Sequence, residues 1–154
     1  MGLDQYLHAK RFASNAEFVN EESRKLFASL MELANVNEFA DEHFPTASIG
    51  VKVAYWRKAN AIHNWFVQNC QNGEDDCQTV FVGREQLEEL RDVCRRVLAD
   101  PSLADELLPT ARGFFFGTTD YDEWYMDSLR YTALTIDKLL TMPVEWDFEY
   151  SSSW

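Results

Sequence analysis

The chain has 154 residues, enough for one domain with a sizeable core, and its 46% of hydrophobic residues excludes a disordered chain. Its net charge of −12 disfavours direct binding to a nucleic-acid backbone, which requires a basic surface. No apolar segment reaches transmembrane length and no basic segment precedes an apolar run, so we expect an intracellular protein that does not bind membranes.

The charge is distributed unevenly along the chain. Residues 1–50 carry 8 acids and 4 bases, residues 51–97 carry 7 of each, and residues 98–154 carry 11 acids and 3 bases. The central third is therefore the least repulsive place for an anion. The final third should form an acidic surface, which either keeps the protein soluble or meets a basic partner.

The first half of the chain predicts two strands around a helix. Residues 2–12 have the composition of a strand. Asn20 is a good N-cap, and apolar residues at helical spacing follow it as far as Asn35. Residues 36–47 predict a loop, and residues 48–54 alternate as in a strand with one buried face.

The stretch 55–66 follows that strand and is predicted to be a helix. At about 100° per residue its apolar residues fall on one side, which should face the core. The residues of this predicted core stripe are Tyr55, Ala59, Ile62, Phe66 and Cys70.

The same stretch carries the candidate ligand site. Trp56, Arg57, Asn60 and His63 supply an indole, a guanidinium, an amide and an imidazole, which together suit an anionic, ring-bearing ligand. Lys58 should lie with Arg57 beside the free N–H groups at the start of the helix, which also favour an anion. The alternative is an ordinary amphipathic helix with polar decoration.

The second half predicts two further strand-to-helix units and a final strand. Residues 78–82 predict a short strand, and an arginine-rich helix should run from Arg84 to Leu98. Residues 114–116 predict a buried strand, followed by a helix to about Thr141. The residues on the core side of this helix should be Tyr125, Leu129, Thr132, Ile136 and Leu139. Residues 144–150 alternate strictly as a half-buried antiparallel or edge strand, and residues 151–154 are expected to fray.

Asp120 and Tyr121 precede the last predicted helix. Acidic residues here repel phosphate, but they accept hydrogen bonds from ribose hydroxyls, a base edge or a basic side chain, so both residues are candidates to complete the ligand site. Helix capping by the Asp120, Asp122 and Glu123 carboxylates explains the same residues without a ligand.

Neither a metal nor a cofactor is expected. The three cysteines are an odd number and should be reduced thiols. His63, Cys70 and Cys77 are each seven residues apart, about 10.5 Å along a helix, which is too far for neighbouring ligands of one zinc ion. No glycine-rich phosphate loop is present.

Four motifs together resemble a family of small acidic proteins from tailed bacteriophages. They are Met1-Gly-Leu-Asp-x-Tyr-Leu, Tyr55-Trp-Arg-Lys-Ala-Asn-x-Ile-His63, Asp75-Asp-Cys77, and Gly113-Phe-Phe-Phe-Gly117 with Tyr121-Asp-Glu123. The resemblance implies an accessory phage protein in the cytoplasm of the bacterial host, of a kind that often counters host defences. It implies no particular reaction.

We therefore expect a single α+β domain over residues 1–154, with a mixed, mostly antiparallel sheet of about five strands packed against the central, arginine-rich and C-terminal helices. The first and last strands are expected to pair. The leading hypothesis is a protein that binds and sequesters a small anionic nucleotide-like ligand. The alternatives are an acidic inhibitor or nucleic-acid mimic that binds a basic host protein, and an enzyme with His63 as general base. The surplus of aromatic residues is also compatible with a homodimer.

Overall fold

The computed structural model describes residues 2–113 and 116–154. The described residues form four strands rather than about five. These are β1 (Asp4–Ser14), β2 (Thr46–Arg57), β3 (Val80–Val82) and β4 (Asp147–Ser153). The α-helices are α1 (Glu21–Ala34), α2 (Asn60–Cys70), α3 (Arg84–Ala99), α4 (Ala104–Leu107) and α5 (Glu123–Leu139), and short 3₁₀ turns span Asn37–Phe39 and Pro101–Leu103. The α+β class is confirmed.

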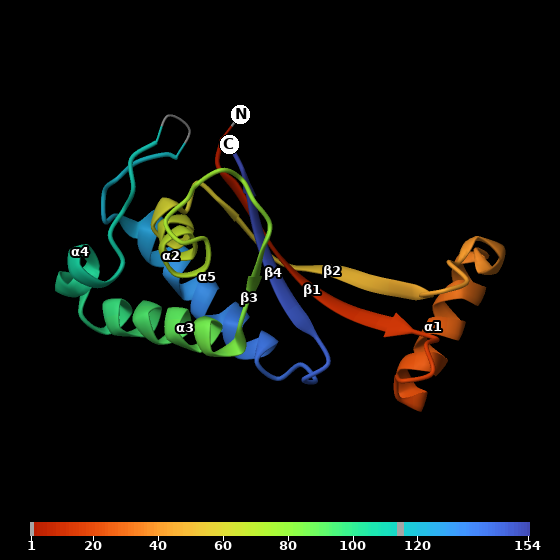
Figure 1. The fold of residues 1–154 in the computed structure, drawn as a ribbon. Helices are drawn as coiled ribbons and strands as arrows, with labels where there is room; N and C mark the ends of the chain where they lie inside the picture. Colours follow the sequence, from red (N-terminus) through yellow and green to blue (C-terminus); the bar gives the residue numbers. More distant parts are fainter. Residues whose placement is uncertain (1, 114–115) are drawn as a thin grey trace. The chain divides into compact units, whose positions relative to one another are not determined.

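The four strands form one antiparallel sheet in the order β2-β1-β4-β3 (Figure 1). The expected pairing of the first and last strands is confirmed, since β1 and β4 are neighbours. β3 pairs antiparallel with β4, with Val80 opposite Tyr150 and Val82 opposite Phe148. β4 is therefore an interior strand and β2 is an edge strand.

The chain divides into two compact units. Unit 1 comprises the described residues of 1–9 together with Lys52–Trp154, and unit 2 comprises Lys10–Val51. Both β1 and β2 have residues in each unit.

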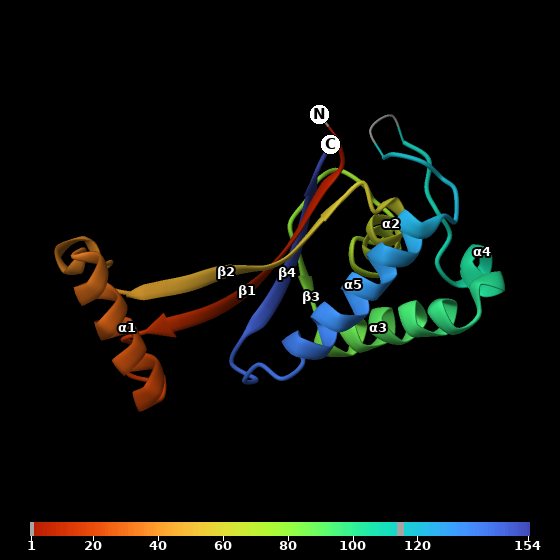
Figure 2. The same cartoon turned by 180° about the vertical axis from the view of Figure 1, so that it is seen from behind.

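Unit 1 contains a large apolar core. The helices α2, α3 and α5 lie on one side of its strands, as Figures 1 and 2 show from opposite directions. These are the central, arginine-rich and C-terminal helices that the sequence predicts. Their apolar faces pack with the buried residues of β1 and β4, and the rings of Phe66 and Tyr150 stack with centroids 3.9 Å apart. The predicted core residues of α5 are all buried: Tyr125, Leu129, Thr132, Ile136 and Leu139.

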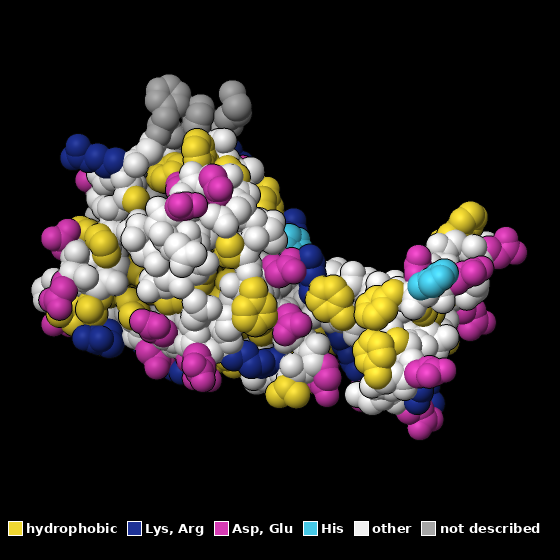
Figure 3. Space-filling view, viewed as in Figure 1, with side chains coloured by type: hydrophobic (Ala, Val, Ile, Leu, Met, Phe, Trp, Pro, Cys, Tyr) yellow, Lys and Arg dark blue, Asp and Glu magenta, His cyan; other side chains and the backbone are white. Residues whose placement is uncertain are grey.

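Unit 2 contains α1 and the remaining parts of β1 and β2. Asn20 caps α1 as predicted, since its side chain accepts a hydrogen bond from the Ser23 N–H at 2.8 Å. Phe27 is the buried residue of this helix. Several large hydrophobic side chains of the unit are exposed, and hydrophobic atoms are plainly visible over its elements in Figure 3: Phe12, Phe18, Leu33, Phe39, Phe44 and Val51.

The predicted helix at 55–66 begins later than expected. Tyr55, Trp56 and Arg57 belong to β2, and the helix starts at Asn60. The chain turns between them at Lys58, which has a left-handed φ of 55° and donates its backbone N–H to the Leu3 carbonyl at 2.7 Å. The strand is longer than predicted because it continues to pair with β1. Tyr55, Trp56 and Arg57 are exposed, buried and exposed in turn, which is the alternation of a strand.

Two further predictions at the ends of elements are wrong. Residues 151–153 do not fray but continue β4, because this strand has a neighbour on each side. Val144 does not face inward: it precedes β4 and is 81% exposed. The predicted strand at 114–116 lies largely outside the described residues, and Phe116 is buried but is not in a strand.

Candidate functional site

Asn60, the first residue of α2, attaches the segment before α5 to this helix. Its amide nitrogen donates to the carbonyls of Phe116 at 3.1 Å and Thr118 at 2.8 Å. Its amide oxygen accepts the N–H of Ala111 at 3.1 Å. The side chain is 4% exposed. Because both amide hydrogens are used, Asn60 organises the surrounding loop and offers no donor to a ligand.

His63 is the centre of a buried polar network. Its Nδ1 lies 2.7 Å from the Tyr150 hydroxyl and its Nε2 lies 2.9 Å from Oδ2 of Asp75. The Tyr150 hydroxyl donates to Oε1 of Gln5 at 3.2 Å, and Nε2 of Gln5 donates to the Ala59 carbonyl at 3.2 Å. The network joins β1, α2, β4 and the segment after α2.

The direction of these hydrogen bonds follows from the Ala59 carbonyl, which can only accept. It fixes the Gln5 amide so that its oxygen faces Tyr150. Burial raises the pKa of Tyr150 well above its usual value, so the hydroxyl keeps its proton and donates it to Gln5. Nδ1 of His63 must then donate to the Tyr150 oxygen. Nε2 of His63 faces Oδ2 of Asp75, so both ring nitrogens of His63 have a hydrogen-bond partner.

This geometry opposes a general-base role for His63. The imidazole is 1% exposed and both ring nitrogens are engaged. A general base must come within hydrogen-bond distance of its substrate. Neither ring nitrogen of His63 is open to a substrate.

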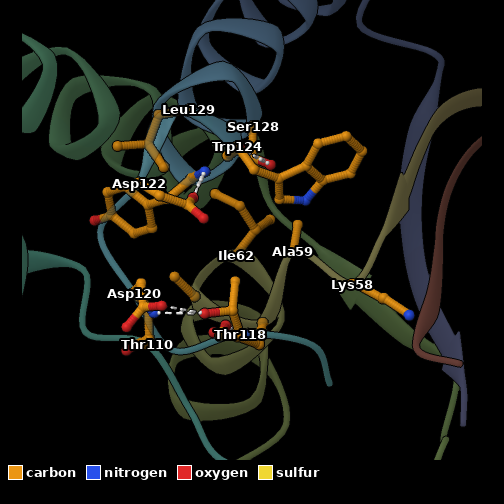
Figure 4. A pocket seen from close by; sticks show the side chains of 13 residues that line it. Lys58, Ala59, Ile62, Thr110, Thr118, Asp120, Asp122, Trp124, Ser128 and Leu129 are labelled. Atoms are coloured by element: carbon orange, nitrogen blue, oxygen red, sulfur yellow. Dashed lines mark hydrogen bonds between the residues drawn. The ribbon is translucent and has the colours of Figure 1, made fainter. Parts of the chain in front are cut away.

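A small pocket, which we call the Asn60 pocket, lies where α2 and α5 begin (Figure 4). Its volume of about 20 Å³ has room for little more than one water molecule. Asp120 and Asp122 line it from two sides, whereas the Lys58 side chain extends away from its centre. A pocket of this size and polarity does not accept a nucleotide-sized anion.

A larger depression, which we call the aromatic groove, runs between the free edge of β2 and α5. It has a volume of about 270 Å³, near the lower end of the usual 300–1,000 Å³ of small-molecule sites. β2 contacts α5 here, since the Tyr55 N–H donates to the Tyr131 hydroxyl at 3.2 Å. The groove is lined by Tyr55, Trp56, Arg57, Ala59, Trp124, Asp127, Ser128 and Tyr131.

Three aromatic rings of the groove are open to solvent. Trp124 is 59% exposed, Tyr131 42% and Tyr55 40%. Trp56, by contrast, is 3% exposed and belongs to the core: its indole N–H donates to the Thr132 hydroxyl at 2.9 Å. The exposed rings offer flat apolar faces on which a planar ligand can stack.

Arg57 is the groove's available cation. Its side chain is 56% exposed, and its Nη1 is 3.9 Å from Oδ1 of Asp4, the limit of an ion pair. Asp4 also accepts the Tyr55 hydroxyl hydrogen bond, which raises the pKa of that hydroxyl and keeps it a neutral donor. The groove's carboxylate, Asp127, pairs with Arg130 at 2.6 Å.

The structure thus separates the predicted site residues. Trp56 and Arg57 line the aromatic groove, whereas Lys58, Asn60 and Asp120 line the Asn60 pocket. His63 lies in neither, and Tyr121 donates its hydroxyl to Oδ1 of Asp105 at 2.9 Å outside both.

Sequence reasoning missed the α5 wall of the groove. Trp124 and Tyr131 are seven residues apart and lie beside the predicted core stripe of that helix, with Ser128 between them. Two exposed aromatic residues at this spacing form a stripe outside the core, which was a usable signal. Gln5, Asp75 and Tyr150 gave no such signal, because each is distant in sequence from the residue that it contacts.

No group of three or more metal-ligating side chains occurs among the described residues. Within the same residues, no helix is both long and apolar enough to cross a membrane. Comparison of the chain with family models, with curated proteins and with solved structures found no match.

Proposed function

We propose that this protein binds a small, ring-bearing anion of the nucleotide class in the aromatic groove. The supporting observation is the combination of three solvent-exposed rings with the weakly paired guanidinium of Arg57 in one depression. The rings stack on a base, and the guanidinium forms charge-assisted hydrogen bonds with a phosphate or carboxylate.

The resemblance of the sequence motifs to phage proteins supports a wider form of the proposal. A phage accessory protein in the host cytoplasm would sequester a nucleotide-like signal and so withhold it from a host defence. Sequestration needs affinity and no chemistry, in keeping with the engaged nitrogens of His63.

The second candidate is an acidic inhibitor of a basic host protein. Asp147 and Glu149 alternate with the buried Phe148 and Tyr150 on β4, as the sequence predicts, and so project from the other face of the sheet. On the face seen in Figure 3, however, acidic and basic side chains are interspersed. The groove therefore carries the stronger proposal.

The direct test is isothermal titration calorimetry with adenosine monophosphate and ADP-ribose. Arg57→Ala should weaken binding about ten- to hundredfold, because a charge-assisted hydrogen bond is lost. Trp124→Ala should weaken it by a similar factor through lost stacking. Both side chains are more than half exposed, so the thermal unfolding midpoint should change little.

Arg95→Ala is the matched control. Arg95 is 52% exposed, close to the 56% of Arg57, but it lies on α3 and pairs with Asp137. Arg95→Ala changes the net charge by the same amount as Arg57→Ala, and it should leave the affinity for both ligands unchanged. Absence of binding to both ligands at millimolar concentration, or binding that Arg57→Ala and Arg95→Ala weaken equally, would reject the groove as the site.

A further inference from the structure

One face of the sheet in unit 1 is not covered by the helices of that unit. α2, α3 and α5 all lie on the other side of its strands (Figures 1 and 2). On β1, Gln5 and Leu7 are fully buried and alternate with less buried residues. Asp4, Tyr6 and His8 therefore project from the uncovered face, because side chains alternate along a strand.

Aromatic rings on this face form a continuous row, which we call the aromatic platform and which consists of His8, Tyr6 and Tyr55. The ring centroids of Tyr6 and His8 are 6.4 Å apart, and those of Tyr6 and Tyr55 are 5.6 Å apart. Tyr55 also lines the aromatic groove. The platform and the groove thus share one residue and form one continuous aromatic surface around the edge of β2.

A cation lies on this platform. The ammonium nitrogen of Lys52 is 5.4 Å from the ring centroid of Tyr6 and 5.7 Å from that of Tyr55. Among the described residues, no carboxylate lies within ion-pair distance of it. On β1, the same face carries one carboxylate, Asp4, which lies 3.9 Å from Nη1 of Arg57. Lys52 and Arg57 outnumber it, so this surface is locally favourable to an anion in a chain with a net charge of −12.

We propose that the ligand of this protein is a dinucleotide, with one base in the aromatic groove and the second on the aromatic platform. This inference rests on the proposed function and extends it. The phosphate between the two bases lies near Lys52 and Arg57, the cations that precede and follow the shared Tyr55 along β2. Alternating rings and cations are the arrangement with which proteins hold successive bases of a single strand.

A charge on the next strand limits the size of the ligand. Asp147 projects from this face of β4, the strand beside β1. Its carboxylate disfavours a phosphate beyond β1. A dinucleotide fits the surface formed by β1 and β2, whereas a longer strand that crossed the sheet would meet this carboxylate.

The test compares adenosine monophosphate with the linear dinucleotide pApA by calorimetry. The dinucleotide should bind at least about fivefold more tightly, which is the lower limit for stacking one more base. Tyr6→Leu should remove this gain and leave the affinity for the mononucleotide unchanged. Lys52→Ala should weaken the dinucleotide, and it should also weaken the mononucleotide, because both ligands are anions. Arg57→Ala should weaken both ligands.

Phe81→Leu is the control for Tyr6→Leu, because Phe81 is a 62% exposed ring on β3, at the other edge of the sheet. It should not alter either affinity. Equal affinities for pApA and the mononucleotide, or a gain that survives Tyr6→Leu, would overturn the dinucleotide inference. Mononucleotide binding that still depends on Arg57 would then leave the proposed function standing, whereas absence of binding to either ligand would reject both.

Discussion

Single polar side chains hold the substructure on which the groove is built. Asn60 has an amide at the start of α2 and uses it to bind three backbone groups of the segment that leads to α5. The polarity of these bonds is fixed, since two of the partners are carbonyls and one is an N–H. Position 60 therefore requires an amide, and another polar group of the same size would not serve.

This requirement gives a prediction for Asn60. Asn60→Asp should destabilise the protein more than Asn60→Ala, although it is the smaller change in shape. The carboxylate faces the carbonyls of Phe116 and Thr118 without a hydrogen to donate, whereas alanine leaves them unpaired but not repelled. We expect a loss of about 1–3 kcal/mol for alanine and more for aspartate in urea unfolding at pH 7. A smaller loss for aspartate would contradict the hydrogen-bond directions of the Asn60 amide.

The buried roles of Asn60 and His63 could not have been predicted from the local sequence. The sequence made Asn60 a candidate for the ligand site, but its partners Phe116 and Thr118 are 56 and 58 residues away. Similarly, His63 is 87 residues from Tyr150. From the sequence of one helix, a polar side chain can be judged available to a ligand. It has a structural role instead when a segment distant in sequence packs over it and takes its hydrogen bonds.

At the scale of elements, α5 supplies one wall of the groove and its N-terminus is fixed by a cap. The Asp122 side chain accepts the N–H of Tyr125 at 3.0 Å. Trp124 lies within this first turn, so the geometry of the groove depends on the cap.

Removal of the cap should therefore lower stability and also disturb the groove. Asp122→Ala should reduce the free energy of unfolding by about 1 kcal/mol, the usual value of an aspartate cap. Glu123→Ala is the matched control: it removes a first-turn carboxylate that is 75% exposed and pairs with Arg130, and it should cost less than about 0.5 kcal/mol. Urea unfolding measures the loss of stability in both variants. Equal losses would show that the hydrogen bond of the Asp122 side chain adds nothing to the effect of a negative charge in the first turn.

Elements with strong local signals were predicted well from the sequence. The cap of α1, the apolar stripe of α5 and the alternation of residues 48–54 correspond to observed elements. The errors lie where pairing between strands decides the outcome. β2 continues through Arg57 because β1 lies beside it, and β4 continues to Ser153 because it is interior.

At the scale of the whole molecule, the two units differ in how much apolar surface they bury. In residues 10–51 the buried hydrophobic residues are Ala13 and Phe27, whereas unit 1 contains the large core cluster. Local stability follows the number of buried apolar contacts.

Amide hydrogen exchange should therefore divide the protein along this boundary. Amides of α1 should exchange orders of magnitude faster than those of α3 and β4, because α1 opens without disrupting the core of unit 1. Mass spectrometry of peptide fragments resolves the difference. Equal protection in α1 and α3 would mean that residues 10–51 are stabilised as strongly as the core, for instance by association with another chain.

The interior position of β4 has a consequence for synthesis. Gln5 and Tyr150 share a hydrogen bond but are 145 residues apart in the chain. At about 5–20 residues per second, a ribosome makes the second of them roughly 7–30 s after the first. Throughout that interval β1 has an open edge, which is a template for aggregation. A stop codon between β1 and residue 147 would make this state permanent. Such a truncated product should accumulate as insoluble protein rather than as a smaller working one.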